Sequence, residues 1–477
     1  MDINMPRKQL LITIIVITLF IIQAMSPFNV IVLAQSQFNF YPEGLEGNVI
    51  KIGVSVSLSG KYSLEGSISL CGLKAAIDWI NENGGINING IGYKLQLIYQ
   101  DDGSNPAEAR KLYQSFVEDG ITLFIAPYGS DLIEAAEAGI RGYPVIMYSY
   151  MPVPDSVLKA TMGDMIVNIA SSIDSRAGLI LDAVVGVDPA ARIGIFYVNN
   201  PYGLSYLSHL TESAPKRGLK VVYQRDYIDV GEVKDAIYSI KSVRPDILVI
   251  VAQSIKEASV IVKELHDGGV NLKLLIIDGV ASLPVFYTNL SSIVAENIAS
   301  VSEWEPEKGI YNPQVASSRD IQWYGPTEDD ILERYMKHCL VQPNWISMGA
   351  AASILLLAKA LEDAGSMKFI DIKNAIINEA VMTFYGIFKV DDTGKQLGHT
   401  PLLVQWIEGE KKIVYPDTLR ETTLKYPAPN WLRPATMPSQ DMTAAPGEVG
   451  GLNLSTLVIA IVMAIVAVVI IIILRRR

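Results

Sequence analysis

The sequence predicts an α/β protein with two lobes of alternating strands and helices, carried on a transmembrane helix at the C-terminal end. Three observations lead to this prediction. Short apolar strands alternate with amphipathic helices from residue 50 to residue 277, the alternation is interrupted once after Tyr148, and Leu454 to Leu474 form one apolar run. Alternating short strands and helices are typical of parallel sheets that helices cover on both faces. The single interruption therefore indicates two lobes.

The first run of the pattern predicts the sheet and helices of one lobe. Ile50-Lys-Ile-Gly-Val-Ser-Val-Ser57 alternates as a strand does, and the helix that begins near Gly66 ends at the glycine pair 84–85. By the same patterns we expect strands at 94–100, 121–126 and 144–148, and helices at 106–119 and 130–142.

The rest of the body predicts a second lobe and a return to the first. The expected helices of the second run are 174–187, one from residue 203, 232–243 and 255–269, and its expected strands are 192–198, 219–224, 246–251 and 273–277. A third section has expected helices at 328–340, 345–365 and 369–379, followed by strands at 384–390, 401–406 and 411–415. This order indicates that the chain crosses back and completes both lobes with a short antiparallel ending.

The C-terminal end predicts a tether and a membrane span. Residues 427–451 hold five prolines and three glycines with almost no apolar pattern, which is typical of an extended linker. The residues 454–474 make a helix of about 31 Å, the thickness of the hydrocarbon core of a bilayer. Because Lys and Arg are retained on the cytoplasmic side, Arg475 to Arg477 predict a body outside the cell. We therefore expect a single-pass anchor in the cell membrane and no cytoplasmic effector domain.

The N-terminal end predicts export. Arg7 and Lys8 precede the apolar stretch Leu10 to Ile22, and Val32-Leu33-Ala34 is a suitable cleavage site, as in a secretory signal. Residues 1–34 are accordingly either a signal peptide that is removed or a signal anchor that is retained. Both alternatives place the body outside.

Charge and composition disfavour several functions and cofactors. The chain has 477 residues, a formal net charge of −11 and no basic stripe outside its termini, which disfavours nucleic-acid binding. Two free, buried thiols are expected for Cys71 and Cys339, with a single bridge as the alternative. The histidines lack metal-ligand spacing and are expected at the surface, so no metal or cofactor is predicted. They are residues 209, 266, 338 and 399.

Two Rossmann-like lobes would suit an enzyme, but the sequence lacks the usual motifs. No Gly-x-Gly-x-x-Gly follows a strand, Gly60-Lys61 is followed by Tyr62 rather than Ser or Thr, and neither Gly-x-Ser-x-Gly nor His-Glu-x-x-His occurs. We therefore predict no catalytic residues. A ligand site is instead expected at the carboxyl ends of the strands.

Several motifs together carry a resemblance to a known family. In chain order they are Ile50-Lys-Ile-Gly-Val-Ser-Val-Ser-Leu-Ser-Gly60, Ile80-Asn-Glu-Asn-Gly-Gly-Ile86, Tyr99-Gln-Asp-Asp-Gly103, Ala126-Pro-Tyr-Gly-Ser130, Asn200-Pro-Tyr-Gly203, Asp278-Gly-Val-Ala-Ser282, Asp391-Asp-Thr-Gly394 and Val404-Gln-Trp406. Over about residues 50–431 they resemble the branched-chain amino-acid (Leu/Ile/Val) binding proteins of ABC importers. The resemblance implies a type I periplasmic binding fold, in which two lobes joined by a hinge of three crossovers close on a solute. It implies lobe 1 at 49–172 and 303–390, and lobe 2 at 173–302 and 391–426.

The resemblance also implies which residues bind the ligand. Ser130 matches the serine that binds the carboxylate of the ligand, Asp278 matches the acidic group that takes its ammonium, and Tyr202 matches a ligand-contacting tyrosine. Each residue has a structural alternative. Ser130 would be the N-cap of a helix, Asp278 part of a turn, and Tyr202 a packing residue of a turn.

Other cleft positions depart from the amino-acid binders. Met147-Tyr-Ser-Tyr-Met151 stands where those proteins offer small residues and a Ser or Thr, so Ser149 is expected to supply the hydroxyl and Tyr150 to narrow the pocket. Glu65 stands where a tyrosine lines the cleft, and Gln253 replaces another aromatic residue. These polar groups predict a ligand more polar than leucine.

The predicted function is that of an extracellular solute-binding receptor of an ABC importer, which captures an amino acid or a similar small polar solute between its lobes. The permease and the ATPase are expected on separate chains, because this chain has one span and no P-loop. The alternative is a ligand-sensing ectodomain that signals through a separate partner, and a third class is an exported enzyme on the same scaffold.

Overall fold

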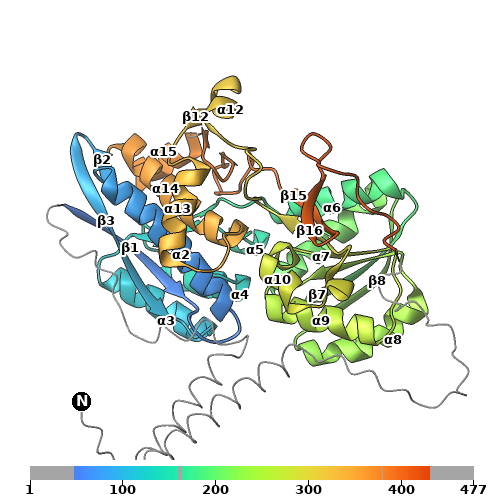
Figure 1. Ribbon diagram of the computed structural model, residues 1–477. Coiled ribbons are helices and arrows are strands. Elements are labelled where there is room, and N and C mark those ends of the chain that lie inside the picture. The colour runs from blue at the N-terminus through green and yellow to red at the C-terminus, as the bar shows by residue number, and fades with distance from the viewer. Residues whose placement is uncertain (1–47, 159–163, 379, 430–477) are drawn as a thin grey trace, which may run out of the picture. The chain divides into compact units, whose positions relative to one another are not determined.

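The computed structural model describes residues 48–158, 164–378 and 380–429, which form two α/β lobes (Figure 1). The expected signal segment 1–34, the expected membrane span 454–474 and most of the expected linker lie outside the described residues.

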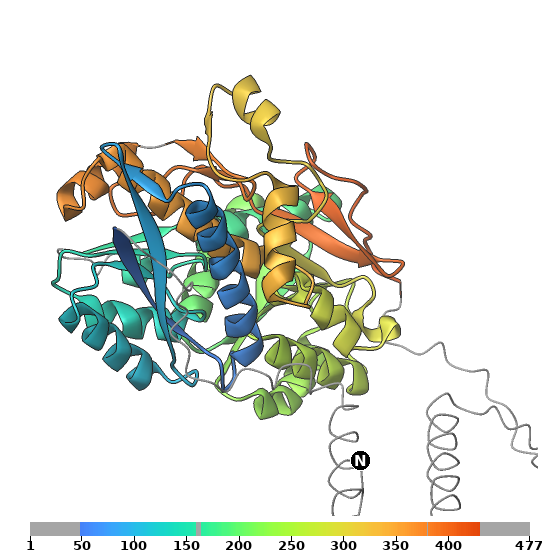
Figure 2. The same ribbon diagram turned by 60° about the vertical axis from the view of Figure 1, so that its left-hand side comes forward.

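Lobe 1 is built on a six-stranded sheet in the order β2-β3-β1-β4-β5-β6. Its strands are β1 (Val49–Val56), β2 (Ile86–Ile88), β3 (Ile91–Asp101), β4 (Leu123–Ile125), β5 (Ile146–Ser149) and β6 (Met165–Asn168). Neighbouring strands are parallel except β2 and β3, which form an antiparallel hairpin. Its helices are α2 (Ser63–Glu82), α3 (Pro106–Glu118), α4 (Ser130–Ile140), α5 (Asp155–Leu158), α13 (Glu328–His338), α14 (Trp345–Ala364) and α15 (Phe369–Asn378). On one face of the sheet α2 packs against α13 and α14, and on the other α3 packs against α4 (Figure 2).

Lobe 2 is built on a seven-stranded sheet in the order β16-β15-β11-β10-β9-β7-β8. Its strands are β7 (Arg192–Val198), β8 (Lys220–Tyr227), β9 (Ile247–Val251), β10 (Leu274–Ile277), β11 (Ala299–Ser302), β15 (Leu402–Ile407) and β16 (Glu410–Tyr415). The first five are parallel to one another, whereas β15 is antiparallel to both β11 and β16. Its helices are α6 (Ile173–Val187), α7 (Pro201–Ser213), α8 (Val233–Val243), α9 (Ile255–Asp267), α10 (Pro284–Asn289) and α11 (Ser292–Ala295), with short 3-10 turns η1 (Pro215–Arg217), η2 (Val230–Glu232) and η3 (Val280–Ser282).

The chain passes between the lobes three times, after β6, after β11 and before β15, as the expected hinge requires. Beside the second crossing lie the short helix α12 (Pro313–Ser318) and a small sheet of β12 (Gln322–Trp323), β13 (Val381–Met382) and β14 (Ile387–Phe388). The sheets are therefore mixed, with parallel centres and antiparallel edges.

Polar side chains cap α7 and α9, two helices that follow strands of lobe 2. The side chain of Asn200 accepts a hydrogen bond from the N–H of Gly203 at 3.0 Å and caps α7. Ser254 and Glu257 form a capping box at the start of α9. Such caps satisfy N–H groups that have no partner within the helix, so the chain turns at a defined residue after these two strands.

Helix α14 is buried inside lobe 1 along most of its length. Among the described residues it is the one helix long and apolar enough to cross a membrane, and 94% of its most apolar window is buried inside the protein. A Cβ atom at Gly72 of α2 would lie 1.8 Å from the carbonyl oxygen of Ser347 in α14. Glycine at residue 72 therefore allows the two helices to approach at backbone distance.

Two stretches differ from the expected local structure. The expected strand 384–390 is shorter: residues 383–386 form a tight turn closed by backbone hydrogen bonds between Thr383 and Gly386 in both directions, and the strand is limited to β14 and an isolated bridge at Val390. The irregular stretch after Tyr148 contains the strand β6, which pairs in parallel with β5. Its four residues are too short a run to show the alternation of a strand.

The two cysteines form a disulfide bond, so the expectation of two free thiols is also wrong. Cys71 lies in α2 and Cys339 directly follows α13, at a sequence separation of 268 residues. They meet because α13 packs against α2, which the local sequence pattern does not reveal.

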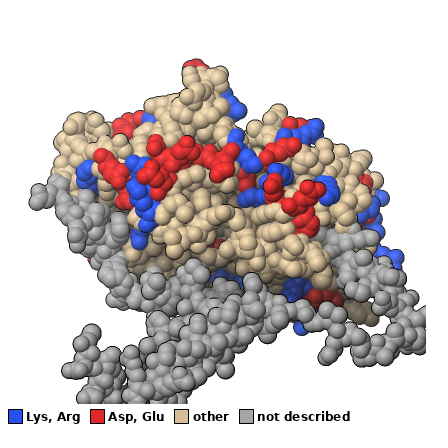
Figure 3. Space-filling view, in the orientation of Figure 1, with Lys and Arg blue, Asp and Glu red and all other residues tan. Residues whose placement is uncertain are grey.

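On the face shown in Figure 3, acidic side chains make up much of the charged surface, with Lys and Arg among them.

Candidate ligand-binding site

The seven residues expected to bind ligand lie on segments that follow strands of the two sheets, and all are buried. Ser130 follows β4, Tyr202 follows β7, Gln253 follows β9 and Asp278 follows β10. Glu65 lies in the helix after β1, while Ser149 and Tyr150 lie at the end of β5. Because ligands of open α/β sheets bind at the carboxyl ends of strands, this placement suits a site between the lobes.

Gln253 forms hydrogen bonds with residues of both lobes. Its side-chain oxygen Oε1 accepts a hydrogen bond from Ser130 Oγ of lobe 1 at 3.1 Å and from Asn200 Nδ2 of lobe 2 at 2.6 Å. Its backbone oxygen accepts one from the hydroxyl of Tyr128 at 2.7 Å. Ser130 does not cap its helix, because Gly129 is the N-cap of α4 and makes no side-chain cap bond. Its hydroxyl is instead directed at lobe 2.

Glu65 forms a second contact between the lobes. Its Oε1 accepts a hydrogen bond from the backbone N–H of Ile255, the first residue of α9, at 2.9 Å. Burial raises the pKa of Glu65 to about 7, although the hydrogen bond from Ile255 lowers it in part and the nearby Glu257 adds to the increase. The carboxyl group therefore carries a charge that depends on pH near neutrality.

The remaining lobe 1 residues make local contacts. Ser149 Oγ donates to the backbone oxygen of Met151 at 2.9 Å and accepts from the N–H of Met151 at 3.3 Å. Tyr150 is buried, and burial raises the pKa of its hydroxyl. The role of Ser149 and Tyr150 toward a ligand stays a prediction.

Asp278 is surrounded by donors of its own lobe. Arg176 donates to Asp278 Oδ1 from Nη2 at 2.8 Å and from Nε at 3.2 Å. The hydroxyl groups of Tyr202 and Tyr206 donate to the same carboxylate. An ionised carboxylate offers about four lone-pair positions, so this hydrogen-bonding shell is filled. The ammonium of a ligand would have to share or replace one of these donors.

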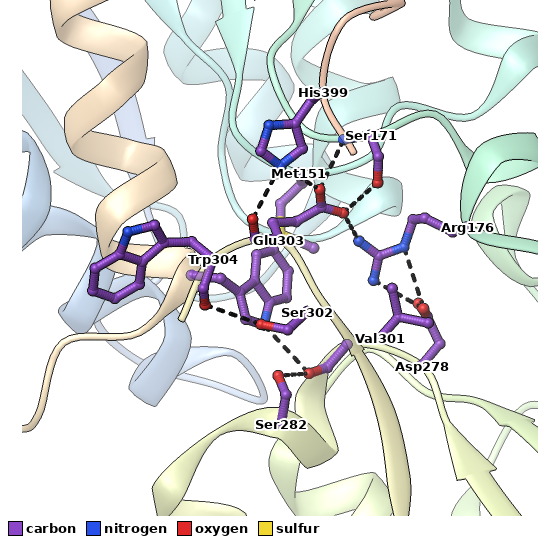
Figure 4. Close-up of polar contacts among 12 residues, drawn as sticks. Met151, Ser171, Arg176, Asp278, Ser282, Val301, Ser302, Glu303, Trp304 and His399 are labelled. Atoms are coloured by element: carbon purple, nitrogen blue, oxygen red, sulfur yellow. Dashed lines mark hydrogen bonds and ion pairs between the residues drawn. The ribbon is translucent and has the colours of Figure 1, made fainter. Parts of the chain in front are cut away.

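Glu303 ties the three chain crossings together (Figure 4). It lies on the second crossing and accepts hydrogen bonds from Ser171 of the first crossing, from the N–H at 3.0 Å and from Oγ at 2.6 Å. His399 of the third crossing places Nε2 3.0 Å from Glu303 Oε2, and Arg176 forms an ion pair with Oε1. Burial alone would raise the pKa of Glu303, but Arg176, His399 and Ser171 outweigh it and lower the pKa to about 2. The expectation that His399 lies at the surface is wrong, because its ring is buried against this acid.

Arg176 therefore joins the hinge to Asp278, the aspartate that is predicted to bind a ligand. Its guanidinium lies between Asp278 and Glu303, and all three side chains are fully buried. The ring of Trp345, from α14 of lobe 1, lies 5.7 Å from the guanidinium carbon, and its Nε1 donates to the carbonyl oxygen of Gly279 at 3.3 Å. A cation over an indole face is attracted to it, so the hinge cluster also touches lobe 1.

Sequence reasoning missed Arg176 and Glu303, although each left a signal. Arg176 falls in the apolar stripe of its helix, with Ile173, Ala177 and Ile180 at helical spacing and all buried. A charged residue in such a stripe needs a buried partner. Glu303 directly follows the short buried strand β11, where an acid at the carboxyl end of the strand points to the same edge.

Comparison with known proteins places this geometry in context. A family model described as periplasmic binding protein matches residues 49–411. Leu/Ile/Val-binding protein homolog 2 of Brucella abortus (strain 2308) is 19% identical over 364 residues, which cover 76% of this chain and 91% of that protein.

Two solved structures share the fold. The branched-chain amino acid transporter substrate binding protein LivJ of Streptococcus pneumoniae, in complex with isoleucine, has a TM-score of 0.62 at 19% identity and covers 77% of this chain and 100% of its own. An ABC transporter solute binding protein from R. palustris, in complex with benzoate, has a TM-score of 0.64 at 15% identity and covers 77% of this chain and 96% of its own. At these identities the likeness concerns the fold alone.

Proposed function

The chain belongs to the periplasmic binding protein family, and from this premise we propose that it is the extracellular solute-binding receptor of an ABC importer. It captures an amino acid or a similar small polar solute between two closing lobes and delivers it to a permease. The permease and the ATPase are separate chains, and this protein performs no chemistry on the solute. Both solved structures compared above are named as ABC-transporter binding proteins, which favours import over the sensing alternative.

The observation that carries the proposal is the convergence of buried polar side chains from both lobes at the strand ends. Ser130 and Glu65 of lobe 1 contact Gln253 and Ile255 of lobe 2, so closing the lobes buries and pairs these groups. Buried polar groups of this kind are kept where they bind something, because each costs free energy when it is left unpaired. A solute of matching polarity that enters between the lobes would pair with the same groups.

Charge near the hinge favours a ligand with a positive group. Asp278 and Glu303 bring two carboxylates against the single guanidinium of Arg176. In a buried site an ammonium group close to Asp278 gains from the attraction of that carboxylate. An α-amino acid, with an ammonium near Asp278 and a carboxylate near Ser130, meets both conditions.

We propose that the body is held at the outer face of the cell membrane by residues 454–474. The disulfide bond between Cys71 and Cys339 supports an exported body, because such bonds persist in oxidising compartments and are rare in the cytosol.

A thermal-shift panel on the purified full-length chain in detergent tests the proposal. The panel holds leucine, isoleucine, polar amino acids, benzoate, sugars and amides. A solute present at a hundred times its Kd stabilises the protein by about 2.7 kcal/mol. We expect a response to at least one amino acid, lost in Asp278→Asn and weakened in Ser130→Ala.

Matched variants at exposed positions, Asp267→Asn and Ser208→Ala, control for nonspecific effects. A response to sugars or amides but to no amino acid would overturn the ligand class and leave the fold untouched. Unchanged amino-acid binding in Asp278→Asn would show that the ammonium binds elsewhere.

A further inference from the structure

Gln253 is held in place by its backbone, while its side chain crosses to lobe 1. Its N–H donates to Glu257 Oε2 at 3.2 Å, within the capping box at the start of α9. Its backbone oxygen accepts the hydroxyl of Tyr128 at 2.7 Å. The residue is buried, so its side chain has one defined direction, toward the start of α4.

The side-chain oxygen of Gln253 takes the hydrogen bonds of two residues that suit a ligand. It lies 3.1 Å from Ser130 Oγ and 2.6 Å from Asn200 Nδ2, one donor from each lobe. The hydroxyl of Tyr62 is 3.4 Å away and also lies 3.2 Å from Asp131 Oδ1, so its single proton is shared between two acceptors. A carboxamide oxygen has two lone pairs, and Ser130 and Asn200 fill them.

Gln253 and a ligand oxygen would compete for the same hydroxyl proton of Ser130. The hydroxyl of Ser130 has one proton, and in the structure that proton is directed at Gln253. An oxygen atom of a solute that is bound by Ser130 must therefore take the place of Gln253 Oε1.

We propose that Gln253 is an intramolecular competitor that sets the affinity and the ligand class of the cleft, a step that rests on the proposed solute-binding function. Its neutral carboxamide oxygen occupies Ser130 and Asn200, and a ligand binds there only by displacing it. Exchange of one neutral oxygen for another gains little. A carboxylate oxygen forms hydrogen bonds that are roughly twice as strong, so it displaces Gln253 with a net gain. The cleft thereby selects solutes that carry a carboxylate.

Substitutions at Gln253 test the competitor role through the sign of their effect. Binding of L-leucine and of benzoate to the full-length chain in detergent is measured by calorimetry for the wild type, Gln253→Leu and Gln253→Glu. We expect Gln253→Leu to bind the acids about tenfold more tightly, because the rival acceptor is gone. Gln253→Glu is expected to bind them at least about tenfold more weakly, because a carboxylate in the chain holds Ser130 and Asn200 more strongly.

The amides leucinamide and benzamide complete the test of ligand class. We expect them to fall below detection on the wild type and to become measurable on Gln253→Leu. Gln224→Leu, at an exposed position of β8, is the matched control and should leave all affinities unchanged. Weaker or unchanged binding of the acids by Gln253→Leu overturns the competitor role and leaves the solute-binding function standing.

A measurement without ligand separates the two proposals. If Gln253 and Ser130 are bonded, the melting temperature of Ser130→Ala/Gln253→Leu should be no lower than that of Gln253→Leu, since Gln253→Leu already removes the hydrogen bond of Ser130. Additive losses would overturn the bond and with it the competitor. A third outcome is that neither L-leucine nor benzoate binds any variant, while the losses in melting temperature are not additive. In that case the proposed ligand class fails, and the hydrogen bond between Ser130 and Gln253 stands.

Discussion

The pKa of a buried acid near the candidate site depends on the groups that contact it. Glu65 and Glu303 are both fully buried acids, yet the pKa of the first is raised to about 7 and that of the second is lowered to about 2. The difference lies in their partners. Glu303 contacts the guanidinium of Arg176, whereas Glu65 has the backbone N–H of Ile255 and no cation among the groups that shift its pKa. Burial disfavours the charged form, and a nearby cation reverses this effect.

We predict that Glu65 links the stability of the contact between the lobes to pH. Because its pKa is raised, its contribution is fully present below its ordinary value of 4.5 and is lost as the pH rises to about 7. A shift of this size corresponds to a change on the order of 3 kcal/mol. We expect the melting temperature of the wild type to fall more steeply between about pH 5 and about pH 8 than that of Glu65→Gln. Glu118→Gln, at an exposed position, should behave as the wild type, and equal slopes for Glu65→Gln and wild type would contradict the prediction.

At the scale of elements, α2 connects the cleft, the core and the disulfide bond. Glu65 near its start contacts lobe 2, Gly72 in its middle lets α14 approach, and Cys71 bonds to Cys339 after α13. One helix thus contacts α13 and α14, two of the three helices that the chain adds to lobe 1 after its second crossing. The covalent link adds to noncovalent contacts between α13 and α2, which include those of Arg334 with Glu82 and of His338 with Asp78.

The disulfide bond predicts a loss of stability on reduction. A bond that closes so long a loop restricts the unfolded chain, and removing such a bond costs about 2–5 kcal/mol. We expect Cys71→Ser/Cys339→Ser to unfold at a correspondingly lower denaturant concentration. Cys71→Ser alone should lose as much as the double variant, and a reducing agent should destabilise the wild type without affecting the double variant. Equal stability of the reduced and oxidised wild type would show that the bond does not hold α13 in place.

At the scale of the whole molecule, three crossings join the lobes. One acid, Glu303, lies on the second crossing and contacts the other two. Glu303 contacts Ser171 on the first crossing and His399 on the third, and Arg176 connects it to Asp278. Hinge closure in two-lobed proteins is borne by a few residues at the ends of elements. This cluster holds the three crossings together at such a place.

The proposed membrane attachment gives a prediction for the full chain. We expect the full-length protein to remain with the membrane fraction after an alkaline carbonate wash, and a chain that ends after residue 451 to be released into the soluble fraction. The physical reason is the length and apolar character of residues 454–474, which match the hydrocarbon core. If the shortened chain also stays with the membrane, residues 1–34 act as a retained anchor rather than as a cleaved signal.

The sequence by itself determined the class of fold and the sheet edge at which the candidate site residues lie. Alternation of strands and helices, and turn motifs such as Asn200-Pro-Tyr-Gly203 directly after a strand, are properties of neighbouring residues. They predicted two lobes, and they placed Ser130, Gln253 and Asp278 at the carboxyl ends of strands, where the structure has them.

Only the tertiary structure decided which of these residues meet. Cys71 reaches Cys339, Ser130 reaches Gln253, and Arg176 reaches Asp278 across sequence separations of 268, 123 and 102 residues. Each pairing depends on how helices pack and how the lobes face one another. Local propensity and period contain no such information, because a buried ion pair or hydrogen bond exists only after both of its partners have left water in the same place.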